Sequence, residues 1–510
     1  MLLAEVAETS RRVAETSRRL EKVDLLSKLL GQLPPDEIEI VVPFLAGQIR
    51  QGKIGVGYGS LRDAAGSPAA NPCLEVAEID RTFQSILAIS GSGSQRRRFE
   101  LLREMLSRAT EAEQHFLISL LVGELRQGAL EAVMVEALAK ASNVAVAKVR
   151  RAVMIAGNVA PIARVLLEKG EAGLDQHDVQ LFRPVQPMLA GSADDVADAI
   201  EELGQAALEF KLDGARIQVH RSGDDVVVYS RSLNDVTAAV PEVVEAVRAL
   251  PAKELILDGE VITLLPDGRP QPFQITMRRF GRKLDVDLLR AELPMTPFWF
   301  DLLHLNGGHL LDETQARRFA ALSAIAPHSL IPHSIASDSK TADEFLEQAL
   351  ARGHEGIMAK ALDAPYAAGS RGQSWLKVKR ARTLDLVILA AEWGHGRRHG
   401  WLSNLHLGAR DTQKGGFAML GKTFKGLTDE MLAWQTEQLL KIESGRDNYT
   451  VYVEPKLVAE IAFNEIQISP RYASGLALRF ARVKRYRPDK TAAEADSFLT
   501  VQRMAGTENG

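Results

Sequence analysis

Apolar residues recur every three or four positions through the first 180 residues, which is the pattern of amphipathic α-helices. The periodicity is clearest over 114–142. Clusters of Gly, Pro and Ser interrupt it at 33–35, 66–72 and 91–94 and mark turns between helices. We therefore expect an all-α region over residues 1–182.

A seven-residue repeat, VAETSRR, occurs at 6–12 and again at 13–19. Two copies are too few for a solenoid or a long coiled coil. The repeat therefore predicts one continuous amphipathic helix near the start of the chain.

Prolines in 182–195 mark a linker, after which apolar and polar residues alternate with the period of two that is typical of strands. Residues 208–221 and 226–232, separated by an SGDD turn, predict a β-hairpin. Further strands are expected at 254–265 and 296–307, and helices at 240–250, 312–326 and 341–352. Residues 183–382 are therefore predicted to form a mixed α+β domain.

Short strands continue from residue 383, in the segments LDLVILAAEW, SNLHLGARD, GFAMLGKTF and YTVYVEPKLVAEIAF. One helix is expected among them, at 428–443. Many short strands with a single helix favour a small β-barrel of about 110–120 residues. We assign residues 383–510 to this domain.

Charge is distributed unevenly along a chain whose net charge is −4. Residues 371–382 carry five Lys or Arg and no acid, and residues 479–490 carry six against one Asp. Local basic surfaces on a nearly neutral protein suit an enzyme that grips a polyanion and still releases it. The alternative for each run is an ordinary solvated face.

The single cysteine, Cys73, excludes an internal disulfide and a cysteine-based zinc site. The first residues are periodic and charged and lack the apolar core of a signal peptide. No run of about 18 apolar residues predicts a membrane span. We expect a soluble, cytoplasmic protein with no membrane partner.

Candidate chemistry starts at Glu209, Lys211 and Asp213. In a strand these three side chains share one face, while Phe210 and Leu212 point to the core. A lysine held on such a strand is a candidate nucleophile.

Lys211 must lose its proton to act as a nucleophile. Burial, or a neighbouring cation such as Arg216 or Lys377, would lower its pKa toward neutrality. An exposed strand with salt-bridged side chains is the alternative interpretation of the same short pattern.

An ordered set of short motifs extends this pattern over about 300 residues. The motifs are PVQPMLA (184–190), EFKLDGAR (209–216), SRSLNDVT (230–237), LDGEVI (257–262), FDLLHLNG (300–307), EGIMAK (355–360), SWLKVK (374–379) and RFARVKRYRPDK (479–490). In order and spacing they resemble the covalent nucleotidyltransferases, and the first and last motifs resemble those of ATP-dependent DNA ligases. QGKIGVGYGSL (51–61) is similar to the helical DNA-binding domain of the same group.

The resemblance implies a fold and a nucleotide chemistry. It implies a helical DNA-binding domain (1–182), a nucleotidyltransferase or adenylation domain (183–382) and an OB-fold domain (383–510). Lys211 would attack the α-phosphate of ATP and expel pyrophosphate. Glu209 would accept a hydrogen bond from the adenine amino group. Phe300 would stack on adenine, or it is simply a core residue beside Trp299.

The resemblance also assigns cationic groups to the phosphates and the ribose. Arg216 and Arg231 would contact both, since a guanidinium fork fits phosphate oxygens. Lys377 and Lys379 alternate with apolar residues, so both face one side of a strand and would stabilise charge that develops at the α-phosphate. Arg371, in the loop before them, would reach the nucleotide phosphates.

Glu260 and Glu355 are implied as ligands of Mg²⁺ or Mn²⁺, because carboxylate oxygens suit a cation that keeps several of its waters. The alternative for each is an ordinary surface carboxylate. Asp213 is expected to orient metal or hydroxyl in later steps. Arg482 and Lys490, with Asp489, are expected to close over the site and orient the departing pyrophosphate.

The implied reaction has three phosphoryl-type transfers: AMP moves to Lys211, then to the 5′-phosphate of a nick, and the 3′-hydroxyl displaces it. The implied partner is nicked double-stranded DNA, bound independently of sequence by a monomer. Arg96–Arg98 are candidate DNA contacts, or a solvated helix start. An RNA ligase, a capping-type nucleotidyltransferase and an inactive DNA-end scaffold remain as alternatives.

Overall fold

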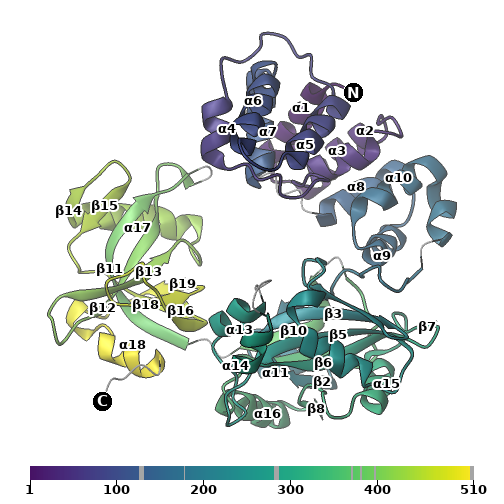
Figure 1. Cartoon of the computed structure of the whole chain (residues 1–510). Helices are drawn as coiled ribbons and strands as arrows, with labels where there is room; N and C mark the ends of the chain where they lie inside the picture. Colours follow the sequence, from purple (N-terminus) through teal and green to yellow (C-terminus); the bar gives the residue numbers. More distant parts are fainter. Residues whose placement is uncertain are drawn as a thin grey trace. The chain divides into compact units, whose positions relative to one another are not determined.

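The computed structural model describes residues 1–125, 131–176, 178–280, 286–368, 371–379, 382–395 and 398–505. The chain forms two compact units, Met1–Val378 and Lys379–Gly510 (Figure 1). Among the helices in the described part, none combines the length and apolar character needed to cross a bilayer.

The first part of the Met1–Val378 unit is helical, which confirms the all-α prediction. Its helices are α1 (Leu3–Glu15), α2 (Arg19–Leu30), α3 (Ile38–Leu45), α4 (Tyr58–Ala64), α5 (Val76–Ala88), α6 (Ser94–Ser107), α7 (Glu111–Val122), α8 (Glu131–Ser142), α9 (Val146–Ala156) and α10 (Val159–Lys169), followed by the 3₁₀ segment η1 (Gly170–Gln176). Their apolar faces share one core, in which Leu26, Phe44 and Phe83 are fully buried. Thr110 and Asn158 cap α7 and α10 by accepting backbone N–H groups.

The VAETSRR repeat does not form one helix, so that prediction was wrong. The first copy lies in α1, but the second copy spans the break between α1 and α2. Thr16 is extended (φ −98°, ψ 141°), and its hydroxyl accepts the Arg18 N–H at 3.1 Å and donates to Glu21 at 2.7 Å. A threonine side chain that bonds nearby backbone competes with helix formation.

Two five-stranded sheets follow in the same unit. The first has the order β1 (Leu189–Ser192), β10 (Arg371–Lys379), β9 (Gly356–Ala361), β2 (Ala206–Phe210) and β8 (His333–Ala336). The second has the order β4 (Asp225–Ser230), β3 (Ala215–Ser222), β5 (Glu254–Thr263), β6 (Met295–Leu305) and β7 (Gly308–His309). The predicted hairpin is confirmed as β3–β4, whereas β2 belongs to the other sheet.

Helices accompany both sheets (Figure 1). They are α11 (Val196–Leu203), α12 (Pro241–Arg248), α13 (Phe273–Phe280), α14 (Val286–Glu292), α15 (Gln315–Ile325) and α16 (Ser339–Ala351). The expected helices at 240–250, 312–326 and 341–352 are thereby confirmed as α12, α15 and α16. The chain runs through β1 and β2 of the first sheet, builds the whole second sheet and then returns to the first with β8, β9 and β10, so strands distant in sequence lie side by side in the first sheet.

The segment 182–188, which we call the lead-in segment, is packed and hydrogen-bonded although its prolines predicted a linker. The Gln218 amide accepts the Val185 N–H at 2.8 Å and donates to the Val185 carbonyl at 3.0 Å. The Gln186 N–H donates to the Met154 carbonyl of α9 at 2.9 Å. Prolines predict an extended chain here, but they do not show what the chain packs against.

The Lys379–Gly510 unit is rich in strands. They are β11 (Arg382–Trp393), β12 (Leu402–Arg410), β13 (Phe417–Thr423), β14 (Glu443–Arg446), β15 (Thr450–Val453), β16 (Val458–Phe463), β17 (Glu465–Ile468), β18 (Leu476–Arg479) and β19 (Arg482–Tyr486), with helices α17 (Asp429–Lys441) and α18 (Phe498–Ala505). The long strand β11 pairs with β12, β15 and β16, and β16 pairs with β19. Between the strands that the structure describes, no pairing closes this sheet into a barrel.

Candidate active site

Lys211 lies where the chain leaves the first sheet for the second. Strand β2 ends at Phe210, so the expected common strand face of Glu209, Lys211 and Asp213 is not formed. The ladder continues for one residue, because the Lys211 N–H donates to the Gly356 carbonyl at 2.8 Å and the Glu355 N–H donates to the Lys211 carbonyl at 3.2 Å. The backbone of Lys211 is thus fixed although its side chain projects from a loop.

Gly214 allows the crossing between the sheets. A Cβ at this position would collide with the Val261 carbonyl oxygen and the Ile262 side chain of β5. The close approach lets the Gly214 N–H donate to Glu260 Oε1 at 3.2 Å. The loop that carries Lys211 is therefore hydrogen-bonded, through Gly214 at the end of the K-x-D-G sequence, to Glu260 of the second sheet.

Two carboxylates act on the Lys211 ammonium. Its Nζ lies 2.6 Å from Glu355 Oε2, and the two side chains are 21% and 16% exposed. Burial raises the pKa of Glu260 to about 7, and the charges of Lys211 and Arg216 oppose that rise. Mg²⁺ is commonly held by one or two carboxylates and keeps several of its waters, so Glu260 and Glu355 are residues that could hold such an ion. No cluster of three or more potential ligand side chains occurs among the described residues.

Glu209 forms a fully buried ion pair that the sequence did not predict. Its Oε2 lies 2.6 Å from Lys360 Nζ, and each side chain is 1% exposed. Burial raises the pKa of Glu209 to about 7, while the Lys360 charge opposes the rise. Glu209 Oε1 has no hydrogen-bond partner among the described residues, which leaves a buried acceptor for a ligand donor. The signal for Lys360 was a lysine within the apolar strand sequence IMAKA.

Phe300 lies beside the buried pair of Glu209 and Lys360. Its ring centroid lies 4.7 Å from Lys360 Nζ and 5.3 Å from the Arg216 guanidinium carbon. It meets the Trp375 ring edge-to-face at 6.0 Å, and it is 8% exposed. The structure thus shows the packing expected of a core residue, with two cations beside the ring.

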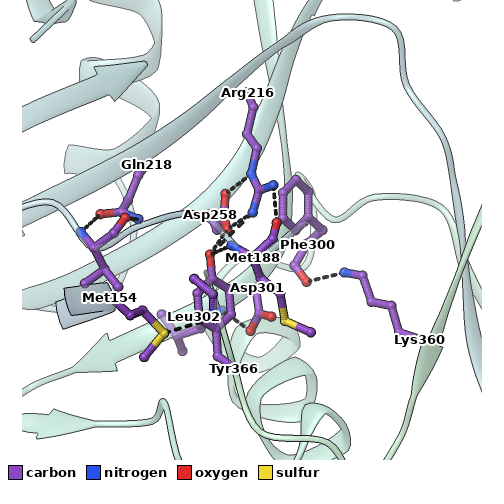
Figure 2. Close-up of polar contacts among 12 residues, drawn as sticks. Met154, Met188, Arg216, Gln218, Asp258, Phe300, Asp301, Leu302, Lys360 and Tyr366 are labelled. Atoms are coloured by element: carbon purple, nitrogen blue, oxygen red, sulfur yellow. Dashed lines mark hydrogen bonds and ion pairs between the residues drawn. The ribbon is translucent and has the colours of Figure 1, made fainter. Parts of the chain in front are cut away.

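Arg216 is held by protein groups, as Figure 2 shows. Its Nε and Nη2 donate to the two carboxylate oxygens of Asp258 at 3.0 and 2.7 Å, and its Nη1 donates to the Met188 carbonyl at 2.6 Å. Burial disfavours the charge, but Asp258 more than compensates and the pKa of Arg216 is raised. A guanidinium has five N–H donors. With a further bond from Nη2 to the Tyr366 oxygen at 3.3 Å, four of them have partners among the described residues.

Other predicted cations lie at the edges of this region. Arg231 is exposed in the turn after β4. Lys377 and Lys379 are half-buried and flank the buried Val378 on β10, as their alternation predicted. Arg371 begins β10 and does not lie in a loop before it, and its side chain falls outside what the structure describes. Asp213 is half-buried in the loop after Lys211.

The late basic motif lies wholly in the Lys379–Gly510 unit. Arg482 is exposed on β19. Lys490 pairs with the carboxylate of Asp385 at 2.5 Å, and Arg487 pairs with the same carboxylate at 2.9 Å. Asp489 pairs with Arg487 at 2.7 Å. Arg487 was missed by the sequence argument, although it opens the RPDK run that contains Lys490.

Fold and site together define a nucleotidyltransferase type of catalytic domain, built on two sheets with a carboxylate-paired lysine where they join. The chain matches three family models. They are "ATP dependent DNA ligase domain" at residues 187–379, "ATP dependent DNA ligase C terminal region" at 398–490 and "DNA ligase N terminus" at 64–139.

Whole-length comparisons agree with these matches. The chain is 56% identical over 512 residues to a probable DNA ligase of Anaeromyxobacter dehalogenans (strain 2CP-C), covering 99% of this chain and 100% of that protein. It is 53% identical over 507 residues to a probable DNA ligase of Sorangium cellulosum (strain So ce56), covering 99% and 95%. The solved structure Pmar-Lig_Pre shares the fold with a TM-score of 0.65 at 18% identity, covering 95% of this chain and 99% of that one. The chain belongs to the ATP-dependent DNA ligase family and is an enzyme of that kind.

Proposed function

We propose that this enzyme seals nicks between a 3′-hydroxyl and a 5′-phosphate in duplex DNA through AMP carried on Lys211. The observation that carries the proposal is the position of Lys211. Its backbone is fixed by two hydrogen bonds to 355–356, and its partly exposed ammonium faces Glu355. A fixed lysine with an accessible amine is what in-line attack on a phosphate requires.

The first transfer forms an N–P bond between Lys211 Nζ and the α-phosphorus of ATP, and pyrophosphate leaves. Because Lys211 Nζ is paired with Glu355, Lys211 becomes a nucleophile only after this pair opens and the ammonium gives up a proton. Mg²⁺ bound by Glu260 and Glu355 would supply charge neutralisation at the phosphates. AMP then passes to the 5′-phosphate, and the 3′-hydroxyl displaces AMP from it, with Asp213 orienting the reacting groups.

Adenine recognition rests on Glu209 and Phe300 in this proposal. The free Oε1 of Glu209 accepts the amino group of adenine, while Lys360 keeps the other oxygen occupied. Phe300 supplies the aromatic face. The fifth N–H of Arg216 is left for the ribose or a phosphate, and Arg231, Arg371, Lys377 and Lys379 complete the cationic lining.

The C-terminal unit acts as a lid in the same proposal. Its strands would complete a closed OB-type barrel, and Arg482 and Lys490 would engage pyrophosphate during the first transfer. Lys490 must leave Asp385 to do so, because one ammonium cannot bind both anions equally well. A monomer binding the DNA backbone, without reading sequence, completes the proposal.

Labelling with α-labelled ATP tests the central step. Wild-type protein incubated with ATP and Mg²⁺ should acquire a covalent label, and Lys211→Ala should acquire none. The matched control is Lys253→Ala, since Lys253 is an exposed lysine of the same domain, and it should label as wild type does. An unlabelled wild type would refute the enzyme mechanism and favour an inactive DNA-end scaffold.

Substrate comparison separates the remaining alternatives. Nicked DNA should be sealed with ATP, and nicked RNA or GTP should support little reaction. Sealing of RNA ends alone would favour an RNA ligase, and a covalent GMP adduct would favour a capping-type enzyme.

A further inference from the structure

The hydroxyl of Tyr366 joins three elements beside the proposed nucleotide site. Tyr366 lies between β9 and β10 and is 2% exposed. Its oxygen donates to Asp258 Oδ2 at 2.8 Å and accepts the Met188 N–H at 3.0 Å. It also accepts from Arg216 Nη2 at 3.3 Å, as Figure 2 shows.

These three bonds use the full capacity of a hydroxyl, which is one donor and two acceptor lone pairs. Burial and the charge of Asp258 raise the pKa of the Tyr366 phenol well above its usual value, so the donor proton stays in place. Removing the oxygen would leave the buried Met188 N–H without this partner and would loosen both members of the Arg216–Asp258 pair.

The network ties the lead-in segment to both sheets. Asp258 and Arg216 come from β5 and β3 of the second sheet, whereas Tyr366 follows β9 of the first. Met188 is bound twice, through its N–H by Tyr366 and through its carbonyl by Arg216. The position of the Arg216 guanidinium, 5.3 Å from the Phe300 ring centroid, therefore depends on a hydroxyl that lies outside the motifs recognised in the sequence.

We propose that Tyr366 is a positioning residue for the ATP-consuming step, which holds Arg216 and Asp258 in the orientation that meets the nucleotide. The inference rests on the proposed contact between Arg216 and ATP. It predicts a defect in ATP use and not in the joining of DNA ends that already carry AMP.

The test compares Tyr366→Phe with wild type in two assays. Self-adenylation at varied ATP should show an apparent KM for ATP raised about tenfold, the effect of losing one well-placed hydrogen bond. Sealing of a pre-adenylated nick without ATP should stay within about twofold of wild type, since that step needs no new ATP.

Tyr229→Phe is the matched control. Its hydroxyl also bonds the lead-in segment, donating to the Phe182 carbonyl at 2.8 Å, and its side chain is largely buried. It has no bond to Arg216 or Asp258. Tyr229→Phe should lower the melting temperature but leave the KM for ATP unchanged. If Tyr366→Phe likewise changes only the melting temperature, the positioning role is wrong.

A double variant tests whether the effect of Tyr366 on the KM for ATP depends on Arg216. Arg216→Lys retains the positive charge but loses the planar, forked set of N–H donors of the guanidinium. Adding Tyr366→Phe to it should change the KM for ATP by less than about twofold, because both changes remove the same contact. Full additivity would overturn the proposal.

If Tyr366→Phe does not fold, a third variant tests the same positioning role. Asp258→Asn preserves shape but weakens the hold on both Tyr366 and Arg216, and it should raise the KM for ATP. A soluble Asp258→Asn protein with wild-type KM would overturn the inference. Absence of a Lys211 adduct in wild type would instead refute the proposed function, so the two failures are distinguishable.

Discussion

At the scale of single residues, neutral histidine in the core makes stability depend on pH. His220 is fully buried, accepts the Phe182 N–H at Nδ1 and faces the Gln218 oxygen through Nε2. Burial, with a smaller effect of His304, lowers its pKa to about 3. The unfolded chain therefore takes up a proton near pH 6.5 that the folded protein does not.

His220 should consequently reduce the free energy of unfolding as pH falls below about 6.5, with a loss of about 2 kcal/mol by about pH 5. Urea unfolding of wild type and His220→Gln at several pH values measures this. The variant should lose about 2 kcal/mol of the acid dependence and keep the part that comes from His333 and His354, whose pKa values burial lowers to about 4. His328→Gln, which changes an exposed histidine, should retain all of it. Parallel curves for wild type and His220→Gln would contradict the expectation.

Residue identity indicated the proposed nucleophile, Lys211, in the sequence but not its neighbours. Lys211, Glu260 and Glu355 stand in recognisable motifs, and the structure brings Lys211 and Glu355 into contact and places Glu260 within its electrostatic reach. The burial of Lys360 could not be predicted from the sequence, because a buried lysine is recognised only once its partner, here Glu209, is known. Tyr366 escaped for a similar reason, since its role depends on groups 108 to 178 positions away.

At the scale of elements, the crossing from β2 to β3 depends on Gly214. Gly214→Ala should lower the free energy of unfolding by about 1–3 kcal/mol, because the added methyl meets the backbone of β5. It should also slow self-adenylation more than this loss of stability explains, since the displaced loop carries Lys211. Thermal unfolding and single-turnover labelling measure the two effects.

Gly445→Ala serves as the control for Gly214→Ala. A Cβ at Gly445 would meet open space, so both stability and labelling should match wild type. Equal labelling rates for Gly214→Ala and wild type would show that the loop tolerates the shift.

Periodicity predicted elements well and failed where side chains compete with the helix. The helices α12, α15 and α16 and the β3–β4 hairpin follow directly from spacing. The VAETSRR copies share every residue, yet one is helical and the other contains a break. The second copy also makes a contact with a distant residue, the pairing of its own Arg19 with Glu136 of α8, and the repeat alone does not reveal such contacts.

At the scale of the whole molecule, the proposed lid role of Lys490 separates the steps of the reaction. Lys490→Ala should slow self-adenylation about tenfold or more, because a cation aimed at departing pyrophosphate is lost. Sealing of a pre-adenylated nick should change little. Parallel assays of the two steps measure this.

Lys484→Ala controls for charge on the same motif, since Lys484 is exposed on β19, and it should leave the ratio of the two rates unchanged. Equal losses in both steps for Lys490→Ala would indicate that its pairing with Asp385 serves the stability of the C-terminal unit and not a lid.

The packed lead-in segment has a practical consequence for dissecting this enzyme. Met154 and Ile155 of α9 belong to the same apolar core as Val185 and Phe210, so the proline-rich stretch runs through a shared interior. A fragment that begins at residue 182 would lack Met154 and Ile155 and would expose the apolar side chains of this core to water. Anyone truncating the catalytic half for isolated study should therefore begin upstream of α9.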